Sequence, residues 1–121
     1  MKLTQFEDII AWQKAQDLAV LIYDKFCSTR EFSFKDQIFR ASVSVSNNIA
    51  EGFERGSDND FARFLYISKG SNAEVKSMLY LAKRLHFISD HDMQEGLKLC
   101  VEIGRILNGL INAVKNKVPK T

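Results

Sequence analysis

The sequence has little cysteine, proline or glycine, and it has no long hydrophobic run. Its 121 residues include two cysteines, one proline and six glycines. So few helix breakers leave room for long uninterrupted helices. Cys27 and Cys100 do not make the disulfide framework of a small secreted domain, and they lack the spacing of zinc ligands. We therefore expect two buried free thiols, and we expect no membrane span because no apolar window is long enough.

The sequence also has little excess charge of either sign. The net charge is only +2, so bulk charge does not indicate nucleic-acid binding, and any such binding needs a local patch. The hydrophobic share of 45% and the charged share of 26% are ordinary for a globular protein. The opening MKLTQFEDII carries acids early and no long apolar stretch, so we expect no signal peptide and a cytoplasmic protein. The length favours a single domain over residues 1–121.

Apolar residues recur at steps of three and four in four stretches, which is typical of amphipathic helices. The predicted helices cover residues 8–28, 34–52, 58–87 and 90–116. Thr4 with Glu7 has the spacing of a capping box, and Asp8 is an alternative cap for the first helix. The run Ser57-Asp58-Asn59-Asp60 is a dense start signal for the third helix, and either Ser89 or Asp90 is suited to cap the fourth. Short connections between four such helices predict an all-α, antiparallel up-and-down four-helix bundle.

The second predicted helix has a competing interpretation. Ser42–Ser46 alternates with a period of two, which is typical of a strand. The 4-3 spacing of Phe34, Ile38, Ala41 and Val45 extends beyond that stretch and favours a helix. Serine, valine and asparagine are weak helix formers, so neighbouring helices must hold this one in place.

Small residues in the third predicted helix indicate a close helix–helix contact. Ser68, Gly70 and Ser71 cluster at its centre. A glycine inside a helix costs about 1 kcal/mol relative to alanine, and the close approach of another backbone is one reason to keep it. We therefore expect Gly70 and Ser71 to lie against the second helix near residues 41–45, where a bulky replacement of Gly70 would overpack the contact.

Polar side chains follow one side of the second helix. The predicted polar network consists of Arg40, Ser44, Asn47, Asn48 and Glu51, with Glu74 on the third helix. Asn48 lies on the apolar seam, and a buried asparagine needs hydrogen-bond partners. The network would fix helix register or a subunit contact. No nucleophile or metal-ligand set accompanies it, and His86 and His91 alone are weak evidence for a metal. We therefore expect no catalytic, cofactor or metal site.

A basic stripe runs along the third predicted helix. The candidate nucleic-acid-binding residues are Lys69, Lys76, Lys83, Arg84, Tyr66 and Tyr80. Basic groups interleaved with aromatic rings are what a surface that binds phosphates and bases requires. The alternative is a solvated helix flank, because lysines seldom lie inside a protein.

Three segments resemble a known family. They are FEDIIAWQKA at residues 6–15, QIFRASVSVSNNIAEG at 37–52 and FARFLYISKGSNAE at 61–74. The family is the 23S ribosomal RNA intervening-sequence proteins, small bacterial four-helix-bundle proteins that mostly have no established activity. The resemblance implies a homopentamer, and a related branch, the accessory protein of diversity-generating retroelements, binds nucleic acid and a reverse transcriptase. Family members often have two basic residues before Ala41, whereas Phe39-Arg40 supplies one, which weakens the transfer of nucleic-acid binding.

The leading hypothesis is a non-enzymatic, homo-oligomeric bundle that forms a ring and binds RNA, DNA or a nucleoprotein. It needs no cofactor and no membrane. Trp12, Phe53 and Tyr66 are the candidate oligomer contacts, because a single bundle covers such large groups poorly. The alternative is a structural protein–protein interaction scaffold with no nucleic-acid role; an enzyme comes third.

Overall fold

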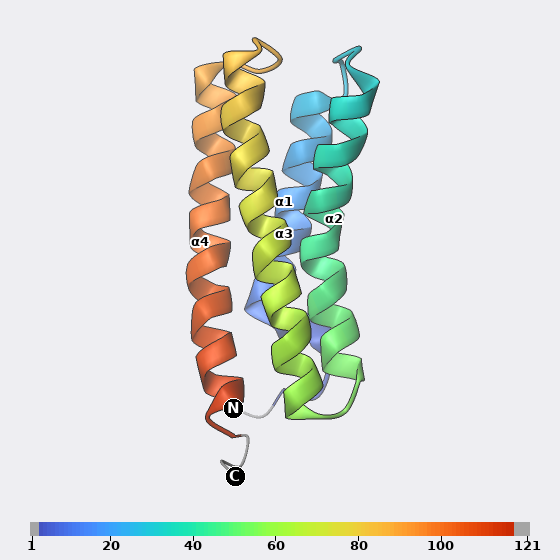
Figure 1. Ribbon diagram of the computed structural model, residues 1–121, viewed down its shortest axis with the longest axis vertical. Coiled ribbons are helices and arrows are strands. Elements are labelled where there is room, and N and C mark those ends of the chain that lie inside the picture. Colours follow the sequence, from blue (N-terminus) through green and yellow to red (C-terminus); the bar gives the residue numbers. More distant parts are fainter. Residues whose placement is uncertain (1–2, 118–121) are drawn as a thin grey trace.

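Four antiparallel α-helices form the bundle, and a computed structural model describes residues 3–117. The elements are η1 (Phe6–Asp8), a short 3-10 helix, followed by α1 (Ile10–Phe26), α2 (Phe32–Glu54), α3 (Asp58–Arg84) and α4 (Asp90–Lys115). Each helix packs against the next, and α4 closes the arrangement against α1 (Figure 1). The predicted all-α bundle is confirmed, with no strand among the described residues. None of the described helices is long and apolar enough to cross a membrane.

Two of the predicted helix starts are confirmed and one is wrong. The hydroxyl oxygens of Ser57 and Ser89 accept hydrogen bonds from the backbone N–H groups of Asp60 at 3.2 Å and Asp92 at 3.1 Å. Neither Thr4 nor Asp8 caps α1. Ile9 precedes the helix instead, with no side-chain cap among residues 3–117, and it is buried in the core. Burial of this apolar side chain outweighs capping preference in setting the start of α1.

The stretch Ser42–Ser46 lies inside α2, so the helical interpretation is confirmed. Helical geometry buries Val45 in the core together with Ile38 and Ala41 of the 4-3 seam, and Phe34 packs against that core partly buried. The serine hydroxyls are satisfied within the helix: Ser42 donates to the carbonyl of Phe39 at 2.7 Å, and Ser46 donates to that of Val43 at 3.2 Å. Packing therefore compensates for the weak intrinsic propensity of this segment.

The contact between α2 and α3 uses the expected serines but not the expected glycine. Ser71 and Ser44 share a hydrogen bond of 2.9 Å, and buried Ser68 donates to the carbonyl of Val45 at 2.7 Å. The prediction for Gly70 is wrong. It is exposed, and among the described residues no atom beyond its own turn of helix backbone lies within 4 Å of where its Cβ would be. One residue corresponds to about 100° of helix rotation, so Gly70 points away from the seam that holds Ser71.

The two cysteines differ in their surroundings. Cys100 is buried as expected, and burial raises the pKa of its thiol to about 12. Cys27 is exposed, so its predicted burial is wrong; its sulfur donates to the carbonyl of Asp24 at 3.3 Å. The apolar face of α1 ends at Phe26, which leaves the following residue outside the core.

Candidate nucleic-acid interface

The predicted basic stripe lies on one side of α3. We define the α3 row as Tyr66, Lys69, Ala73, Lys76, Tyr80 and Lys83, which follow one another at alternating steps of three and four residues. All are exposed except Lys76, which is half-buried, and exposed Arg84 ends the helix beside the row. Residues at these spacings share one face of a helix, so the structure brings the candidate residues together on one surface.

A second row on α4 was missed by the sequence analysis. We define the α4 row as Gln94, Lys98, Val101, Arg105, Asn108, Asn112 and Lys115, again at alternating steps of four and three. Every member is exposed, and neither row contains an acid. The three cations of this row are visible in the sequence, but uncharged residues separate them. The row indicates a binding surface only once the structure places α4 beside α3.

The two rows meet along the groove between α3 and α4. The Lys115 ammonium donates to the Tyr66 hydroxyl at 3.2 Å and lies 5.6 Å from the centre of its ring. Tyr80 lines a shallow groove together with Lys98 and Arg105. We call the combined surface of the two rows the α3–α4 face.

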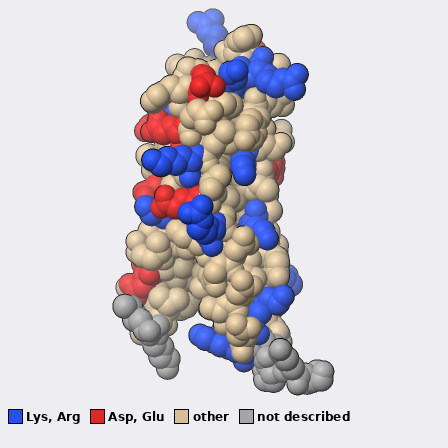
Figure 2. Space-filling view, turned by 90° about the vertical axis from the view of Figure 1, so that its left-hand side faces the viewer, with Lys and Arg blue, Asp and Glu red and all other residues tan. Residues whose placement is uncertain are grey.

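Acidic side chains of α4 are directed toward α1 instead. Glu102 forms an ion pair of 3.0 Å with Lys14, and this contact raises the pKa of the lysine. Glu102 also reaches one edge of the shallow groove, where Lys14 offsets its charge. Most acids lie toward the left of Figure 2, which views the molecule from the side of α4, while basic groups predominate on the right. The α3–α4 face therefore carries a net positive charge, and Glu102 at the edge of its groove is paired with Lys14 of α1.

Among residues 3–117, one cluster of metal-ligating groups lies at the start of α4. His91, Asp92 and Glu95 place their ligand atoms within 4.8 Å of one another. The Lys25 ammonium binds both carboxylates, at 3.1 Å to Asp92 and 3.0 Å to Glu95, and this raises the pKa of Lys25. The two carboxylates thus already neutralise a cation of the chain, which makes them poor ligands for another.

Within the chain, the predicted polar network does not form one connected set. Asn48 donates to the hydroxyl of Ser44 at 2.9 Å and to its carbonyl at 2.8 Å, and Ser44 continues the contact to Ser71 on α3. The deeply buried asparagine is instead Asn72, whose amide donates to the carbonyl of Cys100 at 2.9 Å. The sequence analysis missed this residue because Asn72 lies next to the seam serine rather than on the predicted seam.

The other four predicted network residues, Arg40, Asn47, Glu51 and Glu74, are exposed. Arg40 pairs with Asp36 at 3.2 Å, Glu51 pairs with Arg55 at 3.6 Å, and Glu74 accepts a hydrogen bond from Gln37 at 3.5 Å. The spacing of Arg40, Asn47 and Glu51 does place them on one side of α2, as expected, but that side faces water in the single chain.

The three candidate oligomer contacts differ in how far the single bundle buries them. Trp12 and Phe53 are half-buried and pack against the core, with ring centres 5.3 Å from Phe6 and 5.7 Å from Phe61. Tyr66 is 47% exposed and belongs to the α3 row. The single bundle therefore covers two of the three side chains well, and other apolar groups are more exposed.

The comparisons with known proteins agree on a family. The family model described as "23S rRNA-intervening sequence protein" matches residues 7–109. A search of curated proteins finds no match. A crystal structure from Bacteroides thetaiotaomicron, described as a protein with unknown function from the S23 ribosomal protein family, is 25% identical and superposes with a TM-score of 0.80, over 84% of this chain and 98% of that one. The chain belongs to the 23S rRNA-intervening sequence protein family.

Proposed function

We propose that this protein is a non-enzymatic module that binds unpaired RNA or DNA on its α3–α4 face, with several copies assembled in a ring. The observation that supports this most strongly is the pairing of two acid-free basic rows around exposed Tyr66 and Tyr80. A surface that only needed solubility would mix charges of both signs. Here Glu102, Asp92 and Glu95 of α4 pair with lysines of α1, although Glu102 also borders the groove of the α3–α4 face.

The basic groups supply the electrostatic part of binding. The rows contain six cations: Lys69, Lys76, Lys83, Lys98, Arg105 and Lys115. Each cation that neutralises a phosphate releases a counterion, so affinity falls steeply as salt rises. This attraction acts on any sequence, and we expect little sequence preference.

The tyrosines supply the contacts with bases. Tyr66 is 47% exposed and Tyr80 is 50% exposed, which leaves ring surface free for stacking. Stacking of a base on an aromatic side chain contributes about 1–3 kcal/mol and requires that the base be unpaired. The two rings are separated by fourteen residues of α3, or about 21 Å along the helix axis, so a strand several nucleotides long would reach both.

Assembly would strengthen a face that is weak in one copy. A single α3–α4 face makes few phosphate contacts, whereas several linked faces raise the effective concentration of binding sites along the same strand. The proposed ring would therefore raise the affinity for a long strand by presenting several copies of the same face, without adding a new kind of contact.

Reversing the charge of the α3 row tests the proposal. In a filter-binding titration with an unpaired oligonucleotide at low salt, Lys69→Glu/Lys76→Glu/Lys83→Glu is expected to bind at least about tenfold more weakly than wild type. The matched control is Arg30→Glu/Arg40→Glu/Arg55→Glu, which changes net charge equally at three exposed arginines outside the face and should bind much more tightly than the row variant.

Circular dichroism and light scattering should first show that both variants are folded and have the mass of wild type. Equal binding by the row variant and wild type would contradict the proposal, as would a wild type that binds nothing at low salt. The protein–protein scaffold would then be the better explanation of the fold.

A further inference from the structure

Asn72 places a polar side chain in the buried contact between α3 and α4. It is 5% exposed, and its amide nitrogen donates to the carbonyl oxygen of Cys100 at 2.9 Å. The amide oxygen is also buried, and among residues 3–117 it has no hydrogen-bond partner. A buried oxygen without a partner lowers the stability of a fold, and an apolar side chain of similar size avoids this cost. Stability alone therefore does not explain an asparagine here.

The backbone of α4 is open to this side chain at Gly104. Gly104 lies one turn after Cys100, and a Cβ at this glycine would be 3.6 Å from the amide nitrogen of Asn72. The absence of a side chain at this position leaves the amide a clear approach to the carbonyl of α4. A backbone carbonyl has two lone pairs, so that of Cys100 can accept from Asn72 and still take part in the helix.

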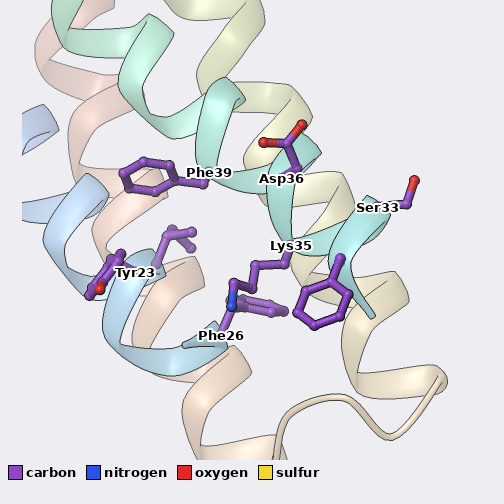
Figure 3. Close-up of a pocket in the computed structure, with 8 residues that line it drawn as sticks. Tyr23, Phe26, Ser33, Lys35, Asp36 and Phe39 are labelled. Atoms are coloured by element: carbon purple, nitrogen blue, oxygen red, sulfur yellow. The ribbon is translucent and has the colours of Figure 1, made fainter. Parts of the chain in front are cut away.

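Apolar and polar contacts fix a pair of helices to different degrees. Near the loop that joins α1 and α2, the rings of Tyr23 and Phe39 face each other with centres 5.9 Å apart, while Asp36 points away (Figure 3). Burial of such groups is favourable but not directional. A hydrogen bond requires a narrow range of distance and angle, so it also fixes the position of one helix along the other. In the α1–α2 pair, the amide of Gln16 makes such a bond to the hydroxyl of Ser46 at 3.0 Å.

The α3–α4 pair depends on Asn72 for this kind of contact. Among residues 3–117, two side-chain hydrogen bonds join these helices: the buried one from Asn72 and the exposed one from Lys115 to Tyr66. Elsewhere the contact is apolar, as where Leu79 meets Gly96. The Asn72 bond is therefore the one described polar contact that fixes α3 against α4 from within the core.

This bond lies directly beneath the α3–α4 face. Lys69 and Lys76 stand three residues before and four residues after Asn72, so they lie one turn to either side of it on α3. On α4, Cys100 lies between Lys98 and Arg105 of the α4 row. A change in the position of α3 along α4 would therefore change the spacing between the cations of the two rows.

We propose that Asn72 is a positioning residue, which holds the α3 row and the α4 row at one spacing so that an unpaired strand can contact both. The inference rests on the proposed function for the purpose of this spacing. It predicts that the hydrogen bond serves position at the expense of stability, as a single asparagine does in the core of a coiled coil.

Distances between two nitroxide spin labels test the positioning without nucleic acid. The labels would be attached to Ala73→Cys on α3 and Gln94→Cys on α4, both exposed, in a Cys27→Ser background. Cys100 can stay, because it is buried and the pKa of its thiol is raised to about 12. Since Lys115 is level with Tyr66, the labelled positions lie fourteen residues, or about 21 Å, apart along the axis. Refolding with excess unlabelled chain would leave one labelled copy in any assembly.

Asn72→Leu removes the hydrogen bond at similar side-chain size, and Leu79→Met is the matched control, a buried residue of the same contact that makes no hydrogen bond. We expect Asn72→Leu to broaden or shift the distribution of spin–spin distances, while its midpoint temperature of unfolding stays at or above that of wild type. The control should keep the wild-type distribution. In filter binding at low salt, Asn72→Leu should bind an unpaired oligonucleotide several-fold more weakly than wild type.

An unchanged distance distribution in Asn72→Leu would overturn the proposal, as would equal broadening in Leu79→Met. A changed distribution with wild-type affinity would show that the spacing does not serve binding, and this would overturn it too. Should Asn72→Leu lose its helical circular dichroism, Asn72→Ala gives the same comparison without adding bulk beside Gly104. A wild type that binds no oligonucleotide would contradict the proposed function, whereas the spin-label distances report on Asn72 in either case.

Discussion

Replacing Ile49 with alanine is expected to lower the free energy of unfolding by about 2–5 kcal/mol. Ile49 is 0% exposed and lies in the C-terminal half of α2. The serines and asparagines around it favour a helix only weakly, so the helix depends on the packing that this side chain provides. Truncation removes buried methyl groups and leaves a cavity that the neighbouring helices fill only in part.

Urea unfolding at one fixed protein concentration measures the loss, since assembly would otherwise change the apparent stability. Ile10→Ala is the matched control, because Ile10 is 53% exposed and its truncation should change stability by no more than about 0.5 kcal/mol. A similar small change in Ile49→Ala would mean that α2 does not depend on this part of the core.

Gly52→Ala is expected to destabilise the protein by about 1–3 kcal/mol, even though alanine is the better helix former. A Cβ at Gly52 would lie 2.5 Å from the Cβ of Phe64 on α3, and neither backbone can move without disturbing the contact. Gly109→Ala is the control: Gly109 also lies within a helix, but among residues 3–117 no atom beyond its own turn of helix backbone is within 4 Å of where its Cβ would be.

Gly109→Ala should therefore raise the free energy of unfolding by up to about 1 kcal/mol through its better helix propensity. In thermal unfolding, the midpoint temperature should fall for Gly52→Ala and rise for Gly109→Ala. If Gly52→Ala were as stable as Gly109→Ala, the close approach of α2 and α3 at this position would be contradicted.

These two glycines also show what the sequence could predict about the fold. Apolar spacing gave the four helices, and serine before an acidic turn marked the starts of α3 and α4. Spacing alone could not show which glycine lies in a helix contact, because a glycine has no side chain to reveal its face. The sequence therefore suggested Gly70 as the glycine in the contact between α2 and α3, whereas the structure places Gly52 there.

Only one of the two rows that form the candidate interface could be predicted from the sequence. The α3 row carries three lysines at intervals of seven residues, which is visible in one helix. The α4 row has three cations among uncharged residues, and its meaning depends on the tertiary contact between Lys115 and Tyr66. The polar side of α2 was placed on one face correctly, but helical spacing does not indicate whether that face meets water or another helix.

Photocrosslinking tests the central claim, binding on the α3–α4 face, most directly. A uridine oligonucleotide carrying 4-thiouridine would be bound to the wild-type protein at low salt, and the complex would be irradiated. Mass spectrometry of the peptides would then identify the residues to which the oligonucleotide is attached. The expected crosslinks fall on the α3 and α4 rows, at or beside Tyr66 and Tyr80, because stacked bases lie closest to these rings. Crosslinks confined to α1 and α2, or none at concentrations where the oligonucleotide is bound, would contradict the claim.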